Sequence, residues 1–292
     1  MLDVARLKVL AAVARHGSVT AAAKELNYAQ PSVSHHLARL EAEVGLRLTQ
    51  KVGRGIRLTP TGDLLAQRAA EILGRVESAE AELAAIAGLR TARVRVAGFQ
   101  SILSTVVADT AAALHATVPD LELILTDVHP TVALDQLRSG AVDVAVIFRY
   151  DDTIPDDIRA QHLFDDPMQL VSRSAEPQTL IDHRDSPWIE GCPGCRQDFL
   201  NACDAEGFTP RIVHSSDDPV VKQALVAAGL GVTAIPELSL QSYRHPGVEA
   251  VELAGFRRRI YLATFGEPPS DPGTSAFVEA LLAAVAARDL AS

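Results

Sequence analysis

The chain has 292 residues, of which 48% are hydrophobic and 22% are charged. This balance is typical of a globular protein with room for two or three domains that each bury a core. The N-terminus lacks a basic segment followed by an apolar run, and no apolar stretch approaches the roughly 20 residues that cross a bilayer, so we expect neither a signal peptide nor a membrane protein. Three cysteines are too few for a disulfide framework in a chain of this size.

The net charge of −10 is distributed unevenly along the chain. Residues 1–60 carry nine Lys and Arg against four Asp and Glu, a balance of +5, and the remaining residues carry 18 against 33, a balance of −15. A basic segment attracts phosphates, whereas an acidic one is repelled by them. The distribution therefore favours an N-terminal phosphate-binding domain joined to a body that stays off nucleic acid.

The N-terminal residues predict three helices. A helix over 2–15 is followed by a second, shorter helix that Ser18 or Thr20 caps with a side-chain oxygen. After a break at 27–29, a third helix spans 30–44. Two short helices joined by such a turn form the helix-turn-helix arrangement, in which the second of the pair enters the major groove of DNA.

The third helix is amphipathic. Val33, Leu37 and Leu40 recur at helical spacing and form its apolar stripe, and Pro31 fits its first turn because a proline there loses no hydrogen bond. The opposite face carries side chains of the kind that read base edges and contact phosphates: Gln30, Ser32, Ser34, His35 and Arg39. An ordinary amphipathic helix pair shows the same pattern, so DNA binding and a purely structural role are both open at this point.

A hairpin and a long helix follow. Two extended segments, 46–51 and 56–58, flank a Gly-Arg-Gly turn and predict a hairpin with Arg54 at its tip. It is either an ordinary surface hairpin or a wing that lies along the phosphate backbone. Residues 60–89 then predict one long helix, capped by Thr59, with a single apolar stripe. That stripe must pack against the chain's own body or, as we expect, against a second copy.

Beyond residue 93 strand-like and helical segments alternate, which predicts a parallel α/β sheet with right-handed crossovers. The expected strands are 94–98, 121–127, 142–148, 168–172, 188–190, 211–214, 231–235, 248–253 and 260–265, and the expected helices are 101–116, 132–139, 197–207, 218–228 and 274–288. Ligands in such sheets bind beyond the carboxyl ends of the strands, and two α/β lobes would enclose a cleft. The stretches 151–155 and 266–272, rich in Pro and Asp, are the expected crossings between the lobes.

Several phrases of the sequence occur together in one family. They are GSVTAAA, QPSVSHHLARLE and GRGIRLTPTG near the N-terminus, and QLRSGAVDVAV and LVAAGLGVTAIP in the body. With these phrases and its order of elements, the chain resembles the LysR-type transcriptional regulators. The resemblance implies a winged helix-turn-helix DNA-binding domain at 1–59, a linker and dimerisation helix at 60–90, and an α/β, periplasmic-binding-protein-like effector domain at 91–292.

The resemblance also implies how such a protein works. The effector domain has two lobes, here about 91–162 with 266–292 and about 163–265, which hold a small organic effector. The regulator binds an interrupted palindrome in double-stranded promoter DNA as a homodimer or homotetramer, and bends that DNA differently once the effector is bound. We therefore expect a cytoplasmic protein that works with RNA polymerase, has no enzymatic activity and needs no metal or cofactor.

Carried onto this chain, the resemblance assigns the DNA contacts residue by residue. Base and backbone contacts come from Ala29, Gln30, Pro31, Ser32, Ser34 and His35, and phosphate contacts come from Thr20, Arg39 and Arg54. Ala29 stands where the family has Ser or Thr, so we expect a recognition helix without a side-chain N-cap. Residues 49–51 stand where the family has an aromatic residue, an acid and Arg, so the packing of the wing is expected to differ.

By family position, the effector contacts are Gln100, Ser101, His129, Thr131, Phe148, Arg149, Gly191 and Cys192. The loop at Gln100 precedes a helix whose free N–H groups suit an anion. Arg149 could bind a carboxylate with two hydrogen bonds, which predicts a small organic anion as the effector. The alternative for Arg149 is a salt bridge to the nearby acids at 151–157.

The segment CPGC at 192–195 has two interpretations. Together with Cys203 and a histidine, His183 or His214, it could form a redox or metal sensor. The irregular spacing and the Pro-Gly centre favour structural cysteines in a turn. A thiol oxidoreductase is the best enzyme alternative, and a transport binding protein is the best alternative for the body, but neither explains a basic helix-turn-helix.

Overall fold

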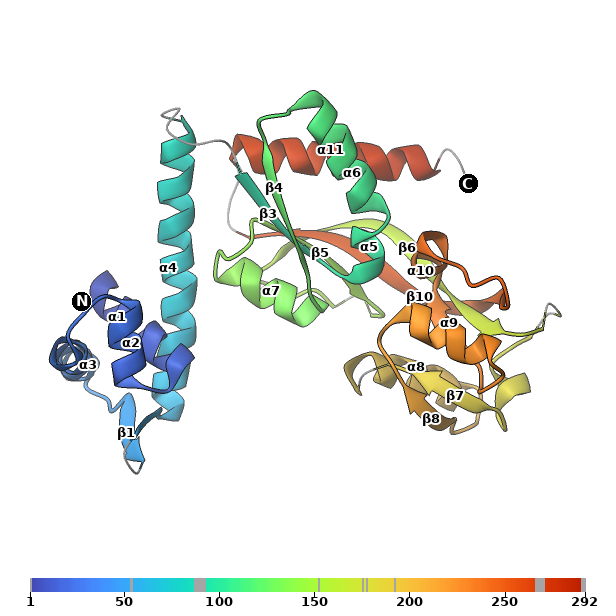
Figure 1. The fold of residues 1–292 in the computed structure, drawn as a ribbon, viewed down its shortest axis with the longest axis horizontal. Coiled ribbons are helices and arrows are strands. Elements are labelled where there is room, and N and C mark those ends of the chain that lie inside the picture. The colour runs from blue at the N-terminus through green and yellow to red at the C-terminus, as the bar shows by residue number, and fades with distance from the viewer. Residues whose placement is uncertain are drawn as a thin grey trace. The chain divides into compact units, whose positions relative to one another are not determined.

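The structure, a computed structural model, describes residues 2–52, 55–86, 93–151, 153–174, 176, 178–191, 193–265 and 271–289 (Figure 1). The chain forms two compact units. Unit 1 comprises residues 1–92 with 135–142, and unit 2 comprises residues 93–134 with 143–292. Of the residues that the structure describes, none forms a helix long and apolar enough to cross a bilayer.

Unit 1 begins with three helices whose ends are set by capping residues. They are α1 (Val4–His16), α2 (Val19–Glu25) and α3 (Gln30–Val44). Gly17 and Gly45 close α1 and α3 in the left-handed conformation, with φ of 59° and 69°, which glycine adopts at little cost. Ser18, one of the two predicted caps, accepts a hydrogen bond from the N–H of Ala21 at 3.3 Å. These features confirm the helix-turn-helix.

The apolar stripe of α3 holds this helix to the rest of unit 1. Val33, Leu37 and Leu40 are buried in one cluster with Leu10 of α1 and with Leu48. Burying each such side chain contributes about 1.5–3 kcal/mol, so the cluster fixes which face of α3 stays in water. The predicted stripe is confirmed.

The predicted hairpin and long helix are present. Strands β1 (Thr49–Val52) and β2 (Gly55–Leu58) pair antiparallel, and the predicted tip residue Arg54 lies outside the described residues. Helix α4 (Pro60–Ile86) starts at Thr59, whose hydroxyl accepts a hydrogen bond from the N–H of Gly62 at 3.0 Å. A Cβ on Gly62 would lie 2.0 Å from the carbonyl oxygen of Leu48, so the glycine is needed for this close backbone approach.

Unit 2 is built on a six-stranded sheet with the strand order β4-β3-β5-β10-β6-β9. Its strands are β3 (Arg93–Gly98), β4 (Glu122–Asp127), β5 (Val144–Arg149), β6 (Arg159–Ser172), β9 (Thr233–Pro236) and β10 (Glu249–Thr264). β3 pairs parallel with β4 and β5, whereas β10 pairs antiparallel with β5 and β6, and β6 pairs antiparallel with β9. The prediction of a parallel sheet is therefore corrected to a mixed sheet.

Two long strands carry the chain between the two ends of this sheet. β6 has 14 residues and β10 has 16, and they pair along almost their whole lengths with register shifts near Gly255 and Ile260. Two strands were predicted where β10 lies, the predicted crossing at 151–155 precedes β6, and most of the predicted crossing at 266–272 lies outside the described residues. The two strands pair with each other along this length, which satisfies their backbone N–H and C=O groups.

A second, two-stranded sheet and the remaining helices complete unit 2. β7 (Pro187–Glu190) pairs parallel with β8 (Arg211–Ser215), and Trp188 bridges to Val232 next to β9. The helices of unit 2 are α5 (Gln100–Leu103), α6 (Val106–Thr117), α8 (Pro193–Ala205), α9 (Pro219–Ala227), α10 (Glu237–Ser242) and α11 (Pro272–Asp289), and α7 (Pro130–Arg138) spans the boundary between the units. The single helix predicted over 101–116 is two helices, and α10 was not predicted.

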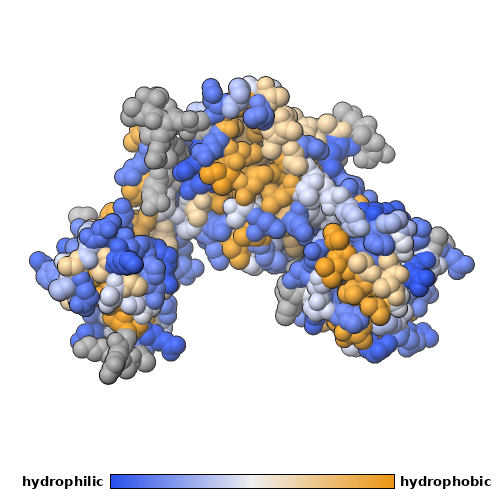
Figure 2. All heavy atoms as spheres, in the orientation of Figure 1, coloured by the Kyte–Doolittle hydropathy of each residue, from blue (hydrophilic) through white to orange (hydrophobic). Residues whose placement is uncertain are grey.

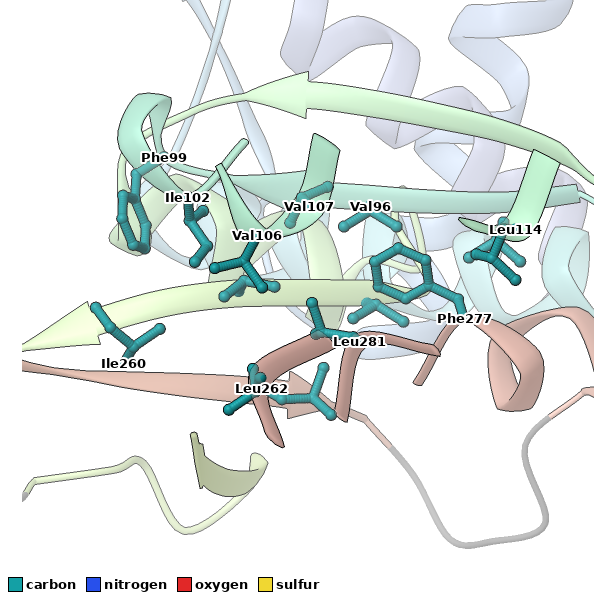
Figure 3. Close-up of a cluster of buried hydrophobic side chains, with 14 of the residues drawn as sticks. Val96, Phe99, Ile102, Val106, Val107, Leu114, Ile260, Leu262, Phe277 and Leu281 are labelled. Atoms are coloured by element: carbon teal, nitrogen blue, oxygen red, sulfur yellow. The ribbon is translucent and has the colours of Figure 1, made fainter. Parts of the chain in front are cut away.

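The largest buried cluster of unit 2 lies between α6, α11 and the sheet (Figure 3). Figure 3 shows Phe277 and Leu281 of α11 directed into it. Figure 2 shows apolar residues also gathered on the surface over β4 and α6, where Val118, Ile124 and Leu125 are exposed. Such an apolar face on an edge strand is unusual for a surface that stays in water.

Candidate nucleic-acid interface and ligand cavity

The outer face of α3 is the first candidate site. Its polar side chains Gln30, Ser32, Ser34, His35 and Arg39 are all exposed. The amide of Gln30 donates a hydrogen bond to the hydroxyl of Ser34 at 3.3 Å, so these two side chains lie side by side one turn apart. Hydrogen-bonding side chains on the first turns of a solvent-facing helix are suited to base edges in a major groove.

The turn before α3 determines how the helix begins. Asn27 adopts φ of 54°, a left-handed conformation that asparagine tolerates, and Tyr28 stacks on His36 of α3 with 5.7 Å between ring centroids. Ala29 is the N-cap and makes no side-chain cap hydrogen bond, as predicted. Two predicted DNA contacts on described residues remain: Pro31 is exposed in the first turn of α3, and Thr20 is exposed on α2.

Glu41, which sequence reasoning missed, ties α3 to the hairpin. Its carboxylate accepts hydrogen bonds from the N–H groups of Leu48 and Thr49 at 2.8 and 3.0 Å and from the Thr49 hydroxyl at 3.1 Å. Burial by itself would raise the pKa of Glu41, but these three donors outweigh burial and lower the pKa below its ordinary range. The carboxylate therefore fixes the start of β1 relative to the recognition helix.

We expect Glu41→Gln to destabilise unit 1 by about 1–3 kcal/mol at neutral pH, because hydrogen bonds to an ionised carboxylate are lost. The folded-state pKa is lowered, so this stabilisation is present above the ordinary carboxyl pKa of about 4.3 and disappears as the pH falls through the folded-state pKa. Hydrogen-exchange mass spectrometry over residues 30–58 measures it. Glu43→Gln, which removes only a surface ion pair with Arg6, is the control and should change exchange little.

The second candidate site is a cavity of about 460 Å³ within unit 2. Its lining comes from the ends of β3, β4, β5 and β7, from α9 and α10, and from the long strands β6 and β10. This is the edge where a sheet of this kind binds ligands. Five of the predicted effector contacts line it: Gln100, Ser101, His129, Phe148 and Gly191.

Three predicted effector contacts are placed differently. Thr131 and Arg149 are not among the described residues that line the cavity, and Cys192 lies outside the described residues. The Nε of Arg149 donates to the carbonyl oxygen of Thr153 at 2.9 Å and lies 3.8 Å from a carboxylate oxygen of Asp151. This geometry favours the salt-bridge interpretation of Arg149 over a contact with a ligand.

A buried ion pair forms one wall of the cavity. Arg258 of β10 donates through Nε to Asp166 of β6 at 2.8 Å and through Nη2 to the hydroxyl of Ser101 at 2.6 Å. Its guanidinium lies 4.6 and 4.7 Å from the ring centroids of Phe99 and Phe148. Because planar guanidinium groups stack on aromatic faces, this arginine holds Ser101 and the two rings in place.

A second buried ion pair lines the cavity between β7 and α9. The Nζ of Lys222 lies 3.4 Å from a carboxylate oxygen of Glu190. Sequence reasoning missed this pair and the Arg258–Asp166 pair. In the sequence, each of these residues is visible only as a charged residue inside an otherwise apolar segment. The sequence does not show which residue it pairs with, because the partners lie 32 and 92 residues away.

Burial shifts the pKa values of two titratable groups in and near the cavity. Burial lowers the pKa of His129, while the nearby Asp217 raises it less, so this imidazole is neutral at neutral pH. Burial raises the pKa of the Cys203 thiol to about 12, which makes it a weak nucleophile. Among the described residues no group of three or more His, Cys, Asp or Glu side chains could hold a metal, while the side chains of the CPGC segment lie outside the described part.

Comparison with known proteins identifies the two domains of the chain. Residues 4–63 match the family of bacterial regulatory helix-turn-helix proteins of the lysR family, and residues 87–286 match the LysR substrate binding domain. A RuBisCO operon transcriptional regulator of Acidithiobacillus ferrooxidans is 29% identical over 298 residues, covering 96% of this chain and 94% of that protein. The curated relatives are transcriptional regulators, not enzymes.

Solved structures share the fold. ArgP from Mycobacterium tuberculosis superposes with a TM-score of 0.71 at 22% identity, covering 98% of each chain. The LysR family regulator CbnR complexed with its target DNA superposes with a TM-score of 0.68 at 22% identity, covering 97% of this chain and 100% of that one. The two family matches place a helix-turn-helix before a substrate-binding domain in this chain, and its fold agrees with those two structures over nearly the whole length. The chain belongs to the LysR family of DNA-binding transcriptional regulators with a substrate-binding domain.

Proposed function

We propose that the chain binds an interrupted palindrome in promoter DNA through the outer face of α3. The observation that carries this proposal is the exposed polar face of α3 inside a helix-turn-helix that matches the family over residues 4–63. Base contacts come from the first two turns, 29–35, and phosphate contacts come from Thr20, Arg39 and Arg54. The bound target of CbnR, whose fold this chain shares, is also DNA.

We infer that the active form is a homodimer or a homotetramer. Helix α4 exposes Leu64, Ile72 and Leu83, and packing against a second copy would bury them. The exposed apolar surface over β4 provides a second candidate interface between copies. In this assignment residues 1–59 bind DNA, 60–90 dimerise and 91–292 hold the effector. The protein then acts in the cytoplasm, where it meets promoter DNA and RNA polymerase.

The cavity of unit 2 is proposed to hold the small-molecule effector. Its volume of about 460 Å³ suits a compact organic molecule, and its lining combines apolar and aromatic side chains with polar ones that can orient a ligand. Gln100, Ser101, His129, Phe148 and Gly191 are its proposed contacts. Because the lining includes both long strands, β6 and β10, a ligand there can change how the two lobes are held.

Footprinting of the purified protein on the DNA upstream of its own gene, across a salt series, tests the DNA-binding proposal. We expect protection of two half-sites on one face of the DNA and an affinity that falls with salt, with a log–log slope of about −0.9 for each phosphate contact. A folded protein that protects no DNA at low salt would contradict the proposal.

Two variants of α3 should separate base reading from phosphate binding. Gln30→Ala should weaken binding to the specific site by about 1–3 kcal/mol and relax the preference at one base pair, because an amide can bind one base with two hydrogen bonds. Arg39→Ala should weaken binding to all sequences alike and lower the salt slope by about one. Fluorescence anisotropy with matched and single-mismatch duplexes measures both effects. Arg244→Ala, in unit 2, removes an exposed ion pair with Glu249 and is the control.

A further inference from the structure

The cavity collects aromatic side chains from a chain that has few. The whole sequence contains eight Phe, four Tyr and one Trp, yet Phe99, Phe148, Tyr150, Phe199 and Phe256 all line this one cavity. Four of them contact one another in a run, with ring centroids 5.0 Å apart for Phe99 and Phe148, 5.8 Å for Phe148 and Tyr150, and 5.6 Å for Tyr150 and Phe256. Offset and edge-to-face packing on such rings favours a ligand that itself carries an aromatic ring.

The charge of Arg258 is not available to an anionic ligand. Arg258 and Asp166 are 4% and 2% exposed, and their nitrogen and oxygen atoms lie 2.7 Å apart at the closest. Asp166 also accepts the N–H of Leu238 at 3.0 Å. A ligand carboxylate would have to compete with a buried carboxylate that already has good geometry, and two buried anions would then share one cation.

The Lys222–Glu190 pair is different because its hydrogen bonds are long. Nζ of Lys222 lies 3.4 Å from Glu190 and 3.5 Å from the carbonyl oxygen of Ala234, and the two backbone N–H groups that reach Glu190, from Gly191 and Ala234, do so at 3.3 Å. Charge-assisted hydrogen bonds are normally 2.7–2.9 Å. The two side chains are 10% and 5% exposed, and both line the cavity. The pair therefore has hydrogen-bonding capacity that a ligand can use.

We propose that the effector is an aromatic compound with an uncharged head that both accepts and donates hydrogen bonds, of the carboxamide type. This inference rests on the proposed role of the cavity as the effector site. The head's oxygen accepts from Lys222 and its N–H donates to Glu190, so the net charge of the pair is left unchanged. A carboxylate would meet the Glu190 anion, and an ammonium group would meet the Lys222 cation, each at the cost of a buried like-charge contact.

Three probes of equal ring size test the proposal on the full-length protein: benzamide, benzoate and benzylamine. Trp188 is the only tryptophan of the chain, and its ring centroid lies 4.8 Å from that of Phe199, a cavity-lining residue, so its fluorescence reports binding. We expect benzamide to bind at least about tenfold more tightly than the two charged probes, which corresponds to 1.4 kcal/mol. Equal or tighter binding of benzoate or benzylamine overturns the proposal, and so does an absence of binding by all three.

Single variants then assign the preference to the ion pair. In Glu190→Gln, benzoate should gain about tenfold in affinity because the like charge is gone, and in Lys222→Met, benzylamine should gain likewise while benzamide loses about tenfold. If either single variant does not fold, the double variant Lys222→Met with Glu190→Met is used instead. In that variant benzamide should no longer bind more tightly than benzoate and benzylamine. Retained discrimination in that variant overturns the proposal. Lys24→Met, an exposed lysine on α2, is the matched control for ligand binding.

The proposal of DNA binding through α3 and the proposal of an uncharged aromatic effector are tested by different experiments, so either can fail alone. Footprinting measures the α3 face without any ligand, whereas the fluorescence titration measures the cavity without DNA. A protein that protects DNA but prefers benzoate would keep its function as a regulator and would lose the assignment of an uncharged effector.

Discussion

Replacing Asp166 by alanine is expected to destabilise unit 2 by about 3–5 kcal/mol, because the substitution leaves the buried guanidinium of Arg258 without its counter-ion. It also removes the acceptor for the N–H of Leu238 at the start of α10. Equilibrium unfolding in urea, followed by the fluorescence of Trp188, measures the loss because this tryptophan is fully buried in unit 2.

Asp165→Ala is the matched control one residue away. Asp165 is about one-third exposed and pairs with Arg257 and His162 at the surface, so its removal should cost less than about 1 kcal/mol. A double variant, Asp166→Leu with Arg258→Met, removes both charges and should be less destabilised than the single variant, since no unpaired ion remains. Equal destabilisation by Asp165→Ala and Asp166→Ala would contradict the importance of the buried pair.

Phe277→Ala is expected to destabilise unit 2 by about 3–5 kcal/mol through loss of buried apolar surface and creation of a cavity. Phe277 is fully buried on α11, in the cluster shown in Figure 3, and the residues around it come from separate elements that cannot all close in on the space. The same urea experiment measures it. Phe277→Leu, which retains most of the volume, should cost much less.

The Phe277→Ala variant also tests whether the two units are stabilised separately. Unit 1 has its own buried cluster, which contains no residue of α11. In dilute urea, where unit 2 of the variant has begun to unfold, hydrogen exchange in α1–α3 should still match that of the unsubstituted protein. Faster exchange in α3 under those conditions would show that the units unfold together.

The sequence predicted the N-terminal part well, because its structure depends on neighbours. Caps, helix-ending glycines and the apolar stripe of α3 act within a few residues, so the missing cap at Ala29 was predicted, and the cap of α2 was narrowed to Ser18 or Thr20, of which the structure selects Ser18. The sequence phrases shared with the family added the prediction of a winged helix-turn-helix. The structure gives the physical reason for one residue of these phrases, Gly62, whose backbone lies too close to Leu48 for a side chain.

Tertiary structure alone decided what the sequence could not. The lengths and directions of β6 and β10 depend on pairing with strands far along the chain, so local patterns showed only their most apolar parts. The same holds for the cavity: Arg258 meets Asp166 92 residues away and Lys222 meets Glu190 32 residues away, while Arg149, the predicted ligand contact, bonds instead to its own loop at Thr153. Spacing along a chain determines periodicity and caps, but only folding brings distant charges together and determines which of them face a ligand.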